Sequence, residues 1–414
     1  MILFYYLVTQ LPLDADPTWE KFVGAATAIK YLGFVCVLYA IFHLTVRGKL
    51  PRYLAAPQAP IFLIFFSINF VSYWTMGGRF SIRTSPFMIE LSMASLFFVV
   101  LSVVDNSPRL RWTLLAAVAA LGWASLFVIR EWVGDPGSRP GWIVGDANYF
   151  AQDACLVLPV MFLFMVRSRV RWERFFVLGC MVVTIVAAML GGSRGGMFAI
   201  GAACLWLIWH SPHRVRNTAI LVVLLIPPLV LSPFSPIQRL IHPKYSDENG
   251  EQARIIAWRA GIRMIQQHPL FWIGLGEFKP QMLKYADPGV HFRSIAHETY
   301  LEVAAETGLP NLVVFLTMIL FTYLSLGRIR RRAADSGPPV LYMAATGLQA
   351  GLVGFCVGAF FLSAEYLKLF WLWIFLSMAL PSLLREGKGK RGQRDQLAES
   401  PTKAIPENTA VLVS

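Results

Sequence analysis

Long apolar runs recur along the whole sequence and leave few folds open to it. A helix that crosses a membrane needs about 20 mainly apolar residues. Candidate runs lie at 1–12, 23–46, 59–75, 86–104, 112–132, 148–166, 174–190, 195–210, 217–233, 309–327, 340–362 and 366–384. Such runs are longer than barrel strands, so the sequence predicts an all-α polytopic membrane protein with about twelve transmembrane helices. The first run is short and lacks a basic stretch or cleavage site, which argues against a signal peptide.

Composition agrees with this class. Only 15% of the 414 residues are charged, against roughly 25% in an ordinary soluble protein. The aromatic content of 14% argues against intrinsic disorder. The five cysteines lie inside apolar runs, so they do not form a disulfide framework.

The apolar runs divide the chain into four parts. Residues 1–233 are predicted to form an N-terminal membrane bundle of about nine helices, and residues 309–384 its last three helices. Between them lies a long loop, 234–308, which is predicted to contain two helices. Residues 385–414 form a basic tail that is predicted to be disordered.

The positions of the basic residues explain the formal net charge of +13. More than half of the 37 basic residues lie in the tail and in the short loops on the tail's side of the membrane. Short loops rich in Lys and Arg stay in the cytoplasm, so the C-terminus is predicted to be cytoplasmic and the long loop to face outward. Because these residues are spread over many loops, nucleic-acid binding is not expected.

Ionisable residues inside the predicted spans share one depth, toward the outer ends of their helices. They are Lys30, Glu90, Arg130, Glu131, Asp153, Arg194, Glu365 and Lys368, and the adjoining outer loops add Arg79, Arg83 and Asp146. Charge within a membrane is costly and often functional, so the set predicts a polar cavity that opens outward. The alternative is that these helix ends only snorkel and pair.

Two segments favour anion binding and acid–base chemistry at that outer face. The segment GGSRGG at 191–196 joins two spans, and a helix start plus Arg194 makes an anion site. Close helix packing by the glycines is the competing interpretation. In the long loop, the predicted helix 252–267 has Arg254 on its apolar edge, and a second helix, 297–307, begins at His297. A histidine there is either structural or an acid–base group.

The second loop helix also carries an acidic stripe. Glu298, Glu302 and Glu306 follow one another at intervals of four residues, where like charges repel. The stripe therefore needs a counter-charge, and Arg259 and Arg263 of the first loop helix are the expected partners.

These segments together carry a resemblance to a known family. In order they are DANYFAQ (146–152), GGSRGG (191–196), the AR-x-x-x-W helix around Arg254, HPLFWIGLGEF (268–278) and HETYLEVAAETGLP (297–310). The chain resembles the O-antigen ligase and polymerase superfamily of bacterial envelope glycosyltransferases. It departs from the family pattern at Ala147, where proline is common, at Glu298, where asparagine is common, and at residues 271–273, which separate Leu270 from the glycine turn.

The resemblance implies a metal-independent glycosyltransferase of the GT-C type in the bacterial inner membrane, with its active site facing the periplasm. The donor would be a glycan on an undecaprenyl-pyrophosphate carrier. The acceptor would be lipid A–core for a ligase or another carrier-linked repeat for an O-antigen or exopolysaccharide polymerase. Other polysaccharide-assembly proteins are possible partners. A protein O-oligosaccharyltransferase of the same superfamily is an alternative.

The resemblance also suggests roles for individual residues. Arg194 and Arg254 match arginines that bind the donor pyrophosphate, and His297 matches the histidine that orients or deprotonates the acceptor hydroxyl. The further substrate-binding candidates are Arg79, Arg83, Asn148, Arg259, Arg263, Tyr300 and Glu306. Arginines can stabilise charge on a leaving pyrophosphate, and a single displacement would invert the anomeric centre.

Other interpretations stay open. Asp14 and Asp16 form a D-x-D pattern that could bind a metal, but a solvated loop is the expected state and no cofactor is predicted. A polysaccharide or lipid-linked sugar transporter could also have twelve spans and an outward cavity, although transporters more often place charges near the midplane. A scaffold component of an assembly machine is a third class.

Overall fold

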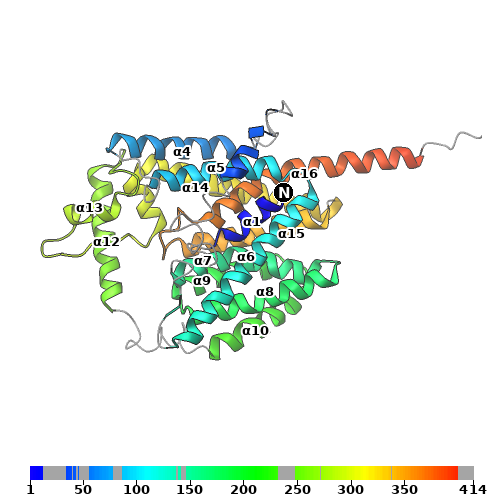
Figure 1. Cartoon of the computed structure of the whole chain (residues 1–414), viewed down its shortest axis with the longest axis horizontal. Coiled ribbons are helices and arrows are strands. Elements are labelled where there is room, and N and C mark those ends of the chain that lie inside the picture. Colours follow the sequence, from blue (N-terminus) through cyan, green and yellow to red (C-terminus); the bar gives the residue numbers. More distant parts are fainter. Residues whose placement is uncertain are drawn as a thin grey trace, which may run out of the picture.

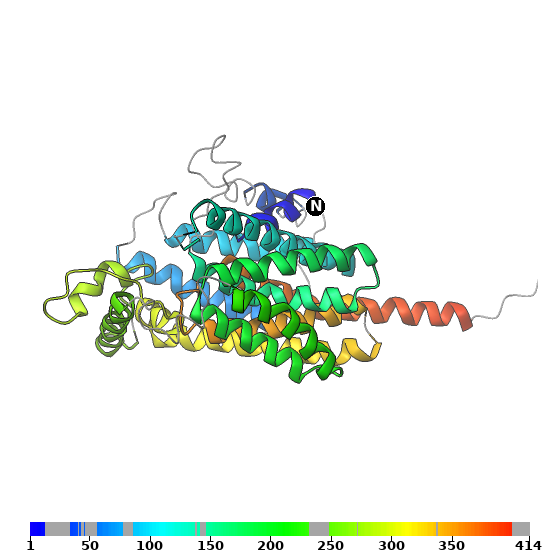
Figure 2. The same cartoon turned by 90° about the horizontal axis from the view of Figure 1, so that it is seen from below.

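A computed structural model describes residues 1–12, 34–39, 41–42, 45, 56–77, 86–136, 139–140, 146–231, 248–270, 272–336 and 338–399. Within these ranges the regular elements are helices and no strand occurs, which confirms the all-α class. The helices are α1 (Ile2–Gln10), α4 (Gln58–Thr75), α5 (Pro86–Val103), α6 (Ser107–Gly134), α7 (Ala147–Arg167), α8 (Arg171–Leu190), α9 (Arg194–Trp209), α10 (Arg214–Leu231), α12 (Glu248–Gln267), α13 (Phe278–Tyr285), α14 (Thr299–Ser336), α15 (Pro339–Gly358) and α16 (Lys368–Glu399). Most of them run along the length of one bundle (Figures 1 and 2).

Seven helices in the described part of the chain are long and apolar enough to cross a membrane: α5, α6, α7, α8, α14, α15 and α16. A polytopic α-helical membrane protein is therefore confirmed, whereas the predicted number of twelve spans is not. With nine residues, α1 is too short to cross a bilayer. The predicted span 23–46 lies mostly outside the described residues.

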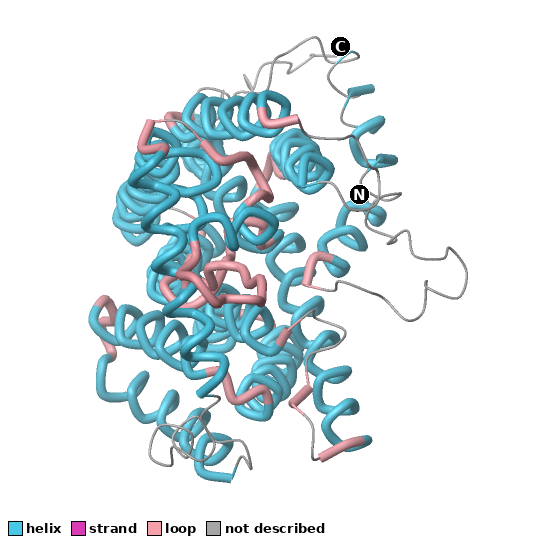
Figure 3. Tube along the Cα trace, turned by 90° about the vertical axis from the view of Figure 1, so that its left-hand side faces the viewer, coloured by secondary structure: helices cyan, strands magenta, loops and turns pink. Residues whose placement is uncertain are grey.

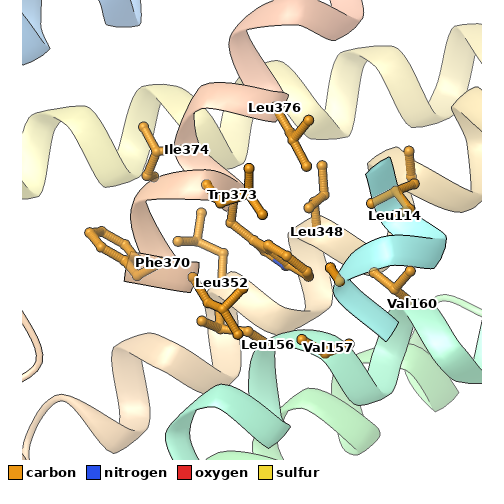
Figure 4. Packing of buried hydrophobic residues seen from close by; sticks show 14 of the residues in the cluster. Leu114, Leu156, Val157, Val160, Leu348, Leu352, Phe370, Trp373, Ile374 and Leu376 are labelled. Carbon is orange, nitrogen blue, oxygen red and sulfur yellow. The ribbon is translucent and has the colours of Figure 1, made fainter. Parts of the chain in front are cut away.

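The core forms where α7, α15 and α16 meet. Trp373 packs there among Leu156, Val160, Leu348 and Leu352 (Figure 4). Small residues allow the close approach of α15 to α7. A Cβ on Gly351 would lie only 2.6 Å from the carbonyl oxygen of Leu156. Close backbone packing of this kind stabilises helix pairs where no hydrophobic effect operates between them.

One end of the bundle carries α12 and α13, and we refer to it as the loop end. There α12 lies across the direction of the other helices (Figure 1), and loops gather at the centre of this end (Figure 3). A small apolar core joins α12, α13 and α14 through Ala257, Met264, Phe278, Met282 and Ala305. The helix α16 projects from the opposite end of the bundle.

Two elements extend beyond their predicted limits. The predicted loop helix 297–307 and the span 309–327 are parts of α14, which bends at Gly308 with φ 84°. The helix α16 continues to Glu399, so the first half of the predicted disordered tail is helical. A helix that is already nucleated extends through Lys, Arg, Glu and Gln at little cost. Residues 400–414 lie outside the described ranges.

Candidate functional site

A polar cleft lies at the loop end, where the starts of α7, α9 and α12 meet the turn after α15. Its volume is about 110 Å³. The lining residues are Arg139, Asn148, Gln152, Ser193, Arg194, Gly195, Gly196, Gly250, Glu251, Arg254, Gly358, Phe361 and Leu362. The cleft thus brings together three residues predicted from the sequence, Asn148, Arg194 and Arg254.

The GGSRGG segment places the start of α9 in the lining of the cleft. Ser193 is the N-cap, and its Oγ accepts a hydrogen bond from the N–H of Gly196 at 3.1 Å. A Cβ on Gly196 would lie 2.2 Å from the Cβ of Ala151, so only glycine lets α9 begin this close to α7. The free N–H groups of a helix start favour bound anions, and Arg194 is the first residue of the helix.

Asn148 holds the cleft together. Its Oδ1 accepts hydrogen bonds from Arg139 Nη2 at 2.9 Å and from Ser193 Oγ at 2.8 Å. Arg139 also donates from Nε to the carbonyl of Gly191 at 2.6 Å. Asp146 caps α7 by accepting the N–H of Asn148 at 2.5 Å. Asn148 therefore positions a third arginine, Arg139, in the lining of the cleft.

An ion pair crosses the cleft between α9 and α12. Arg194 Nη2 lies 2.6 Å from Glu251 Oε1, and the two side chains are 30% and 48% exposed. Glu251 and Arg254 are separated by one helical turn, and both line the cleft. Glu251 belongs to none of the sequence motifs. Its partner Arg194 lies 57 residues away in the chain, so a local pattern could not predict the pairing.

His297 does not line the cleft, but it interacts electrostatically with Arg254, which does. Burial lowers its pKa, Arg254 and Lys279 lower the pKa further, and Asp146 opposes them. Its Nδ1 is buried and has no hydrogen-bond partner among the residues that the structure describes. A histidine with a lowered pKa is neutral at pH 7, which is the form that a general base requires.

Two hydrogen bonds hold the backbone next to His297. His297 has a positive φ of 49°, which is uncommon for a residue other than glycine and persists only under constraint. The N–H of Ala296 is accepted by the Glu302 carboxylate, and the carbonyl of Ala296 accepts from Trp258 Nε1 at 2.8 Å. Glu302 also accepts a hydrogen bond from the Ser363 hydroxyl. Glu302 is therefore a positioning residue.

Glu306 shapes the glycine turn and lies away from the cleft lining. Its carboxylate accepts the N–H groups of Gly276 and Phe278 at 2.8 and 3.0 Å, and it accepts the Tyr366 hydroxyl at 3.3 Å. Tyr300 likewise has a packing contact, since its hydroxyl donates to the carbonyl of Cys356 at 2.8 Å. Both residues were substrate-binding candidates in the sequence, but in the structure their polar atoms bind the protein itself.

The prediction that Arg259 and Arg263 pair with the acidic stripe of the second loop helix is wrong. Arg263 pairs with Asp287 and donates to the carbonyl of Tyr285, and Arg259 lies 3.8 Å from Asp287. The acidic stripe is satisfied by backbone N–H and hydroxyl groups instead, so it needs no arginine. Neither arginine lines the cleft.

Four further candidates, Arg79, Arg83, Asp14 and Asp16, lie outside the described residues. Within the ranges that are described, no group of three or more His, Cys, Asp or Glu side chains is arranged to hold a metal ion.

A comparison with models of known protein families gave a match over part of the chain. A family model described as O-Antigen ligase matches residues 179–316, which run from α8 into α14 and include Arg194, Arg254 and His297. Comparison with curated proteins gave no match. The family match confirms the resemblance seen in the sequence motifs: over residues 179–316 this chain is similar to the O-antigen ligase family.

Proposed function

We propose that the protein transfers a glycan from an undecaprenyl-pyrophosphate carrier to an acceptor hydroxyl at the periplasmic face of the bacterial inner membrane. The observation that carries this proposal is the cleft itself, in which Arg139, Arg194 and Arg254 converge on the start of α9. Guanidinium groups and helix N–H groups are the donors best suited to a phosphate pair.

The donor would bind with its pyrophosphate in the cleft. Arg194 and Arg254 stabilise the negative charge that grows on the leaving oxygen as the bond to the anomeric carbon breaks. Because guanidinium groups stay charged at all working pH values, they supply this stabilisation without a metal ion. Arg139 adds a third positive charge, and Asn148 fixes its direction.

The acceptor would be activated by His297. The neutral imidazole takes the proton of the acceptor hydroxyl while the oxygen attacks the anomeric carbon, and the carrier leaves as a pyrophosphate. One displacement of this kind inverts the anomeric centre. The lowered pKa of His297 supports the base role.

The distribution of basic residues supports the orientation. Arg167 lies in the last turn of α7, Arg214 begins α10 and Arg330 lies near the end of α14. The start of α7 lines the cleft, so its basic end lies at the far end of the bundle. Short cationic connections of this type remain in the cytoplasm. The loop end, with its cleft, then faces the periplasm.

Transfer by the purified protein in lipid nanodiscs tests the proposal. With a carrier-linked glycan and an acceptor, we expect Arg194→Ala, Arg254→Ala and His297→Ala each to abolish product while the protein still folds. Arg293→Ala, which removes an exposed arginine of the same end, serves as the control. Near-normal product from a well-folded His297→Ala would remove the base role, and carrier transport without a new glycosidic bond would contradict transfer altogether.

The acceptor class is tested in cells. In a deletion strain, carrier-linked polymer that accumulates while long-chain lipopolysaccharide is lost indicates a ligase. Single carrier-linked repeats indicate a polymerase, and loss of glycan from protein alone indicates a protein O-oligosaccharyltransferase.

A further inference from the structure

Glu251 places a negative charge in a cleft that is otherwise built for anions. We infer that this carboxylate lowers the affinity of the cleft for a pyrophosphate monoester more than its affinity for a pyrophosphate diester, and so promotes release of the spent carrier after transfer. The inference rests on the proposed function, because it concerns the pyrophosphate that the arginines are proposed to bind.

The contact that carries the inference is short and specific. Glu251 Oε1 lies 2.6 Å from Arg194 Nη2, so a carboxylate oxygen lies where a phosphate oxygen would be bound. Glu251 and Arg254 lie one turn apart on α12 and line the same cleft. Any anion in the cleft therefore has to share Arg194 with Glu251 or displace it.

A carboxylate that weakens anion binding in general would be a disadvantage unless its effect differs between substrate and product. The donor is a diester and has about two negative charges. When the bond between the anomeric carbon and the phosphate oxygen breaks, that oxygen stays with the carrier. The resulting terminal phosphate has a second ionisation with a pKa near 6, so the product gains roughly one further negative charge at neutral pH.

Among the charged residues of the described lining, Arg139, Arg194 and Arg254 are positive and Glu251 is negative. The carboxylate repels the donor and the product alike, but the additional charge of the product adds a repulsion that arises only after transfer. Because Glu251 is 48% exposed, solvent screens the effect, and we expect it to change relative affinity by about tenfold or less.

A matched pair of probes tests the inference on the intact protein in nanodiscs. Farnesyl pyrophosphate and its terminal methyl ester differ by one methyl group and one negative charge. At pH 7.5 we expect Glu251→Gln to raise the affinity for farnesyl pyrophosphate by about tenfold and to raise the affinity for the methyl ester less, so that the ratio of the two affinities changes. Asp135→Asn removes a carboxylate at the end of α6 that does not line the cleft, and it should keep the wild-type ratio.

The outcomes separate this inference from the proposed function. If Arg194→Ala binds both probes as well as the wild type does, the cleft is not the pyrophosphate site and both ideas fail. If Arg194→Ala loses both probes but Glu251→Gln keeps the wild-type ratio of affinities, the proposed function stands and the role of Glu251 is overturned. Under turnover, Glu251→Gln should also be inhibited more strongly by added undecaprenyl pyrophosphate, and unchanged inhibition would likewise overturn it.

Discussion

Ser193 and Asn148 join the starts of two helices by one hydrogen bond, 2.8 Å from Ser193 Oγ to Asn148 Oδ1. Ser193 also caps α9, and Asn148 also accepts from Arg139, so this bond connects the helix start to a cleft arginine. A single amide oxygen therefore accepts hydrogen bonds from the N-cap of α9 and from Arg139 of the cleft lining.

Removal of that oxygen should weaken donor binding. In Asn148→Ala both hydrogen bonds are lost and Arg139 is held less firmly, so we expect the KM for the donor to rise by about tenfold, which is about 1.4 kcal/mol. Asn148→Asp keeps an acceptor oxygen but adds a charge next to Arg139, and it should retain the fold. Steady-state kinetics and thermal unfolding check these expectations. Equal KM values for Asn148→Ala and the wild type would show that Arg139 needs no such support.

The pH dependence of transfer should report the charges around His297. A base acts in its neutral form, so kcat/KM rises with pH through the lowered pKa of His297. Asp146 raises that pKa, so Asp146→Asn should move the acidic limb of the profile to lower pH, while asparagine still caps α7. Lys279 lowers the pKa, so Lys279→Gln should move the limb to higher pH. Shifts in the same direction for both variants would contradict a titrating His297.

Glu302 should affect the chemical step more than donor binding. Its carboxylate holds the N–H of Ala296 next to His297, whereas the cleft arginines lie on other elements. We expect Glu302→Ala to lower kcat by at least about tenfold with little change in donor affinity, because the strained backbone of His297 loses its support. Glu302→Gln keeps an acceptor oxygen and should restore most of kcat. A donor-binding titration separates the two effects, and equal losses in both variants would indicate that the carboxylate charge matters instead.

Two glycines of α9 provide a matched stability test. In Gly196→Ala the new Cβ meets Ala151 at 2.2 Å, so we expect α9 to be pushed from α7, with a lower unfolding temperature and loss of transfer. Gly201 lies in the same helix, and a Cβ there would meet no other element of the described chain within 4 Å. Gly201→Ala should therefore be neutral or stabilise the helix by about 0.5–1 kcal/mol. Similar losses in both variants would show that helix flexibility, not close packing, is what the glycines provide.

Apolar runs and loop motifs predicted the class of fold and three residues that meet in the cleft, since hydrophobic length and local turn chemistry are encoded in short stretches of sequence. Contacts between distant elements were not predictable in this way. Periodicity showed that Glu302 and Glu306 share a face of their helix, but not that the groups opposite are the N–H groups of Ala296, Gly276 and Phe278. The pairing of Arg194 with Glu251 depends on how α12 crosses the bundle, which no local pattern specifies.

The kink at Gly308 in α14 has a consequence for how the site responds to its lipid environment. Gly308 joins two helices directly, the short one that follows His297 and the long apolar one. A membrane helix changes its tilt when bilayer thickness changes. Any such tilt is either absorbed by the bend at Gly308 or passed to the residues that hold the histidine. The geometry of the site should therefore depend on the acyl-chain length of the surrounding lipid.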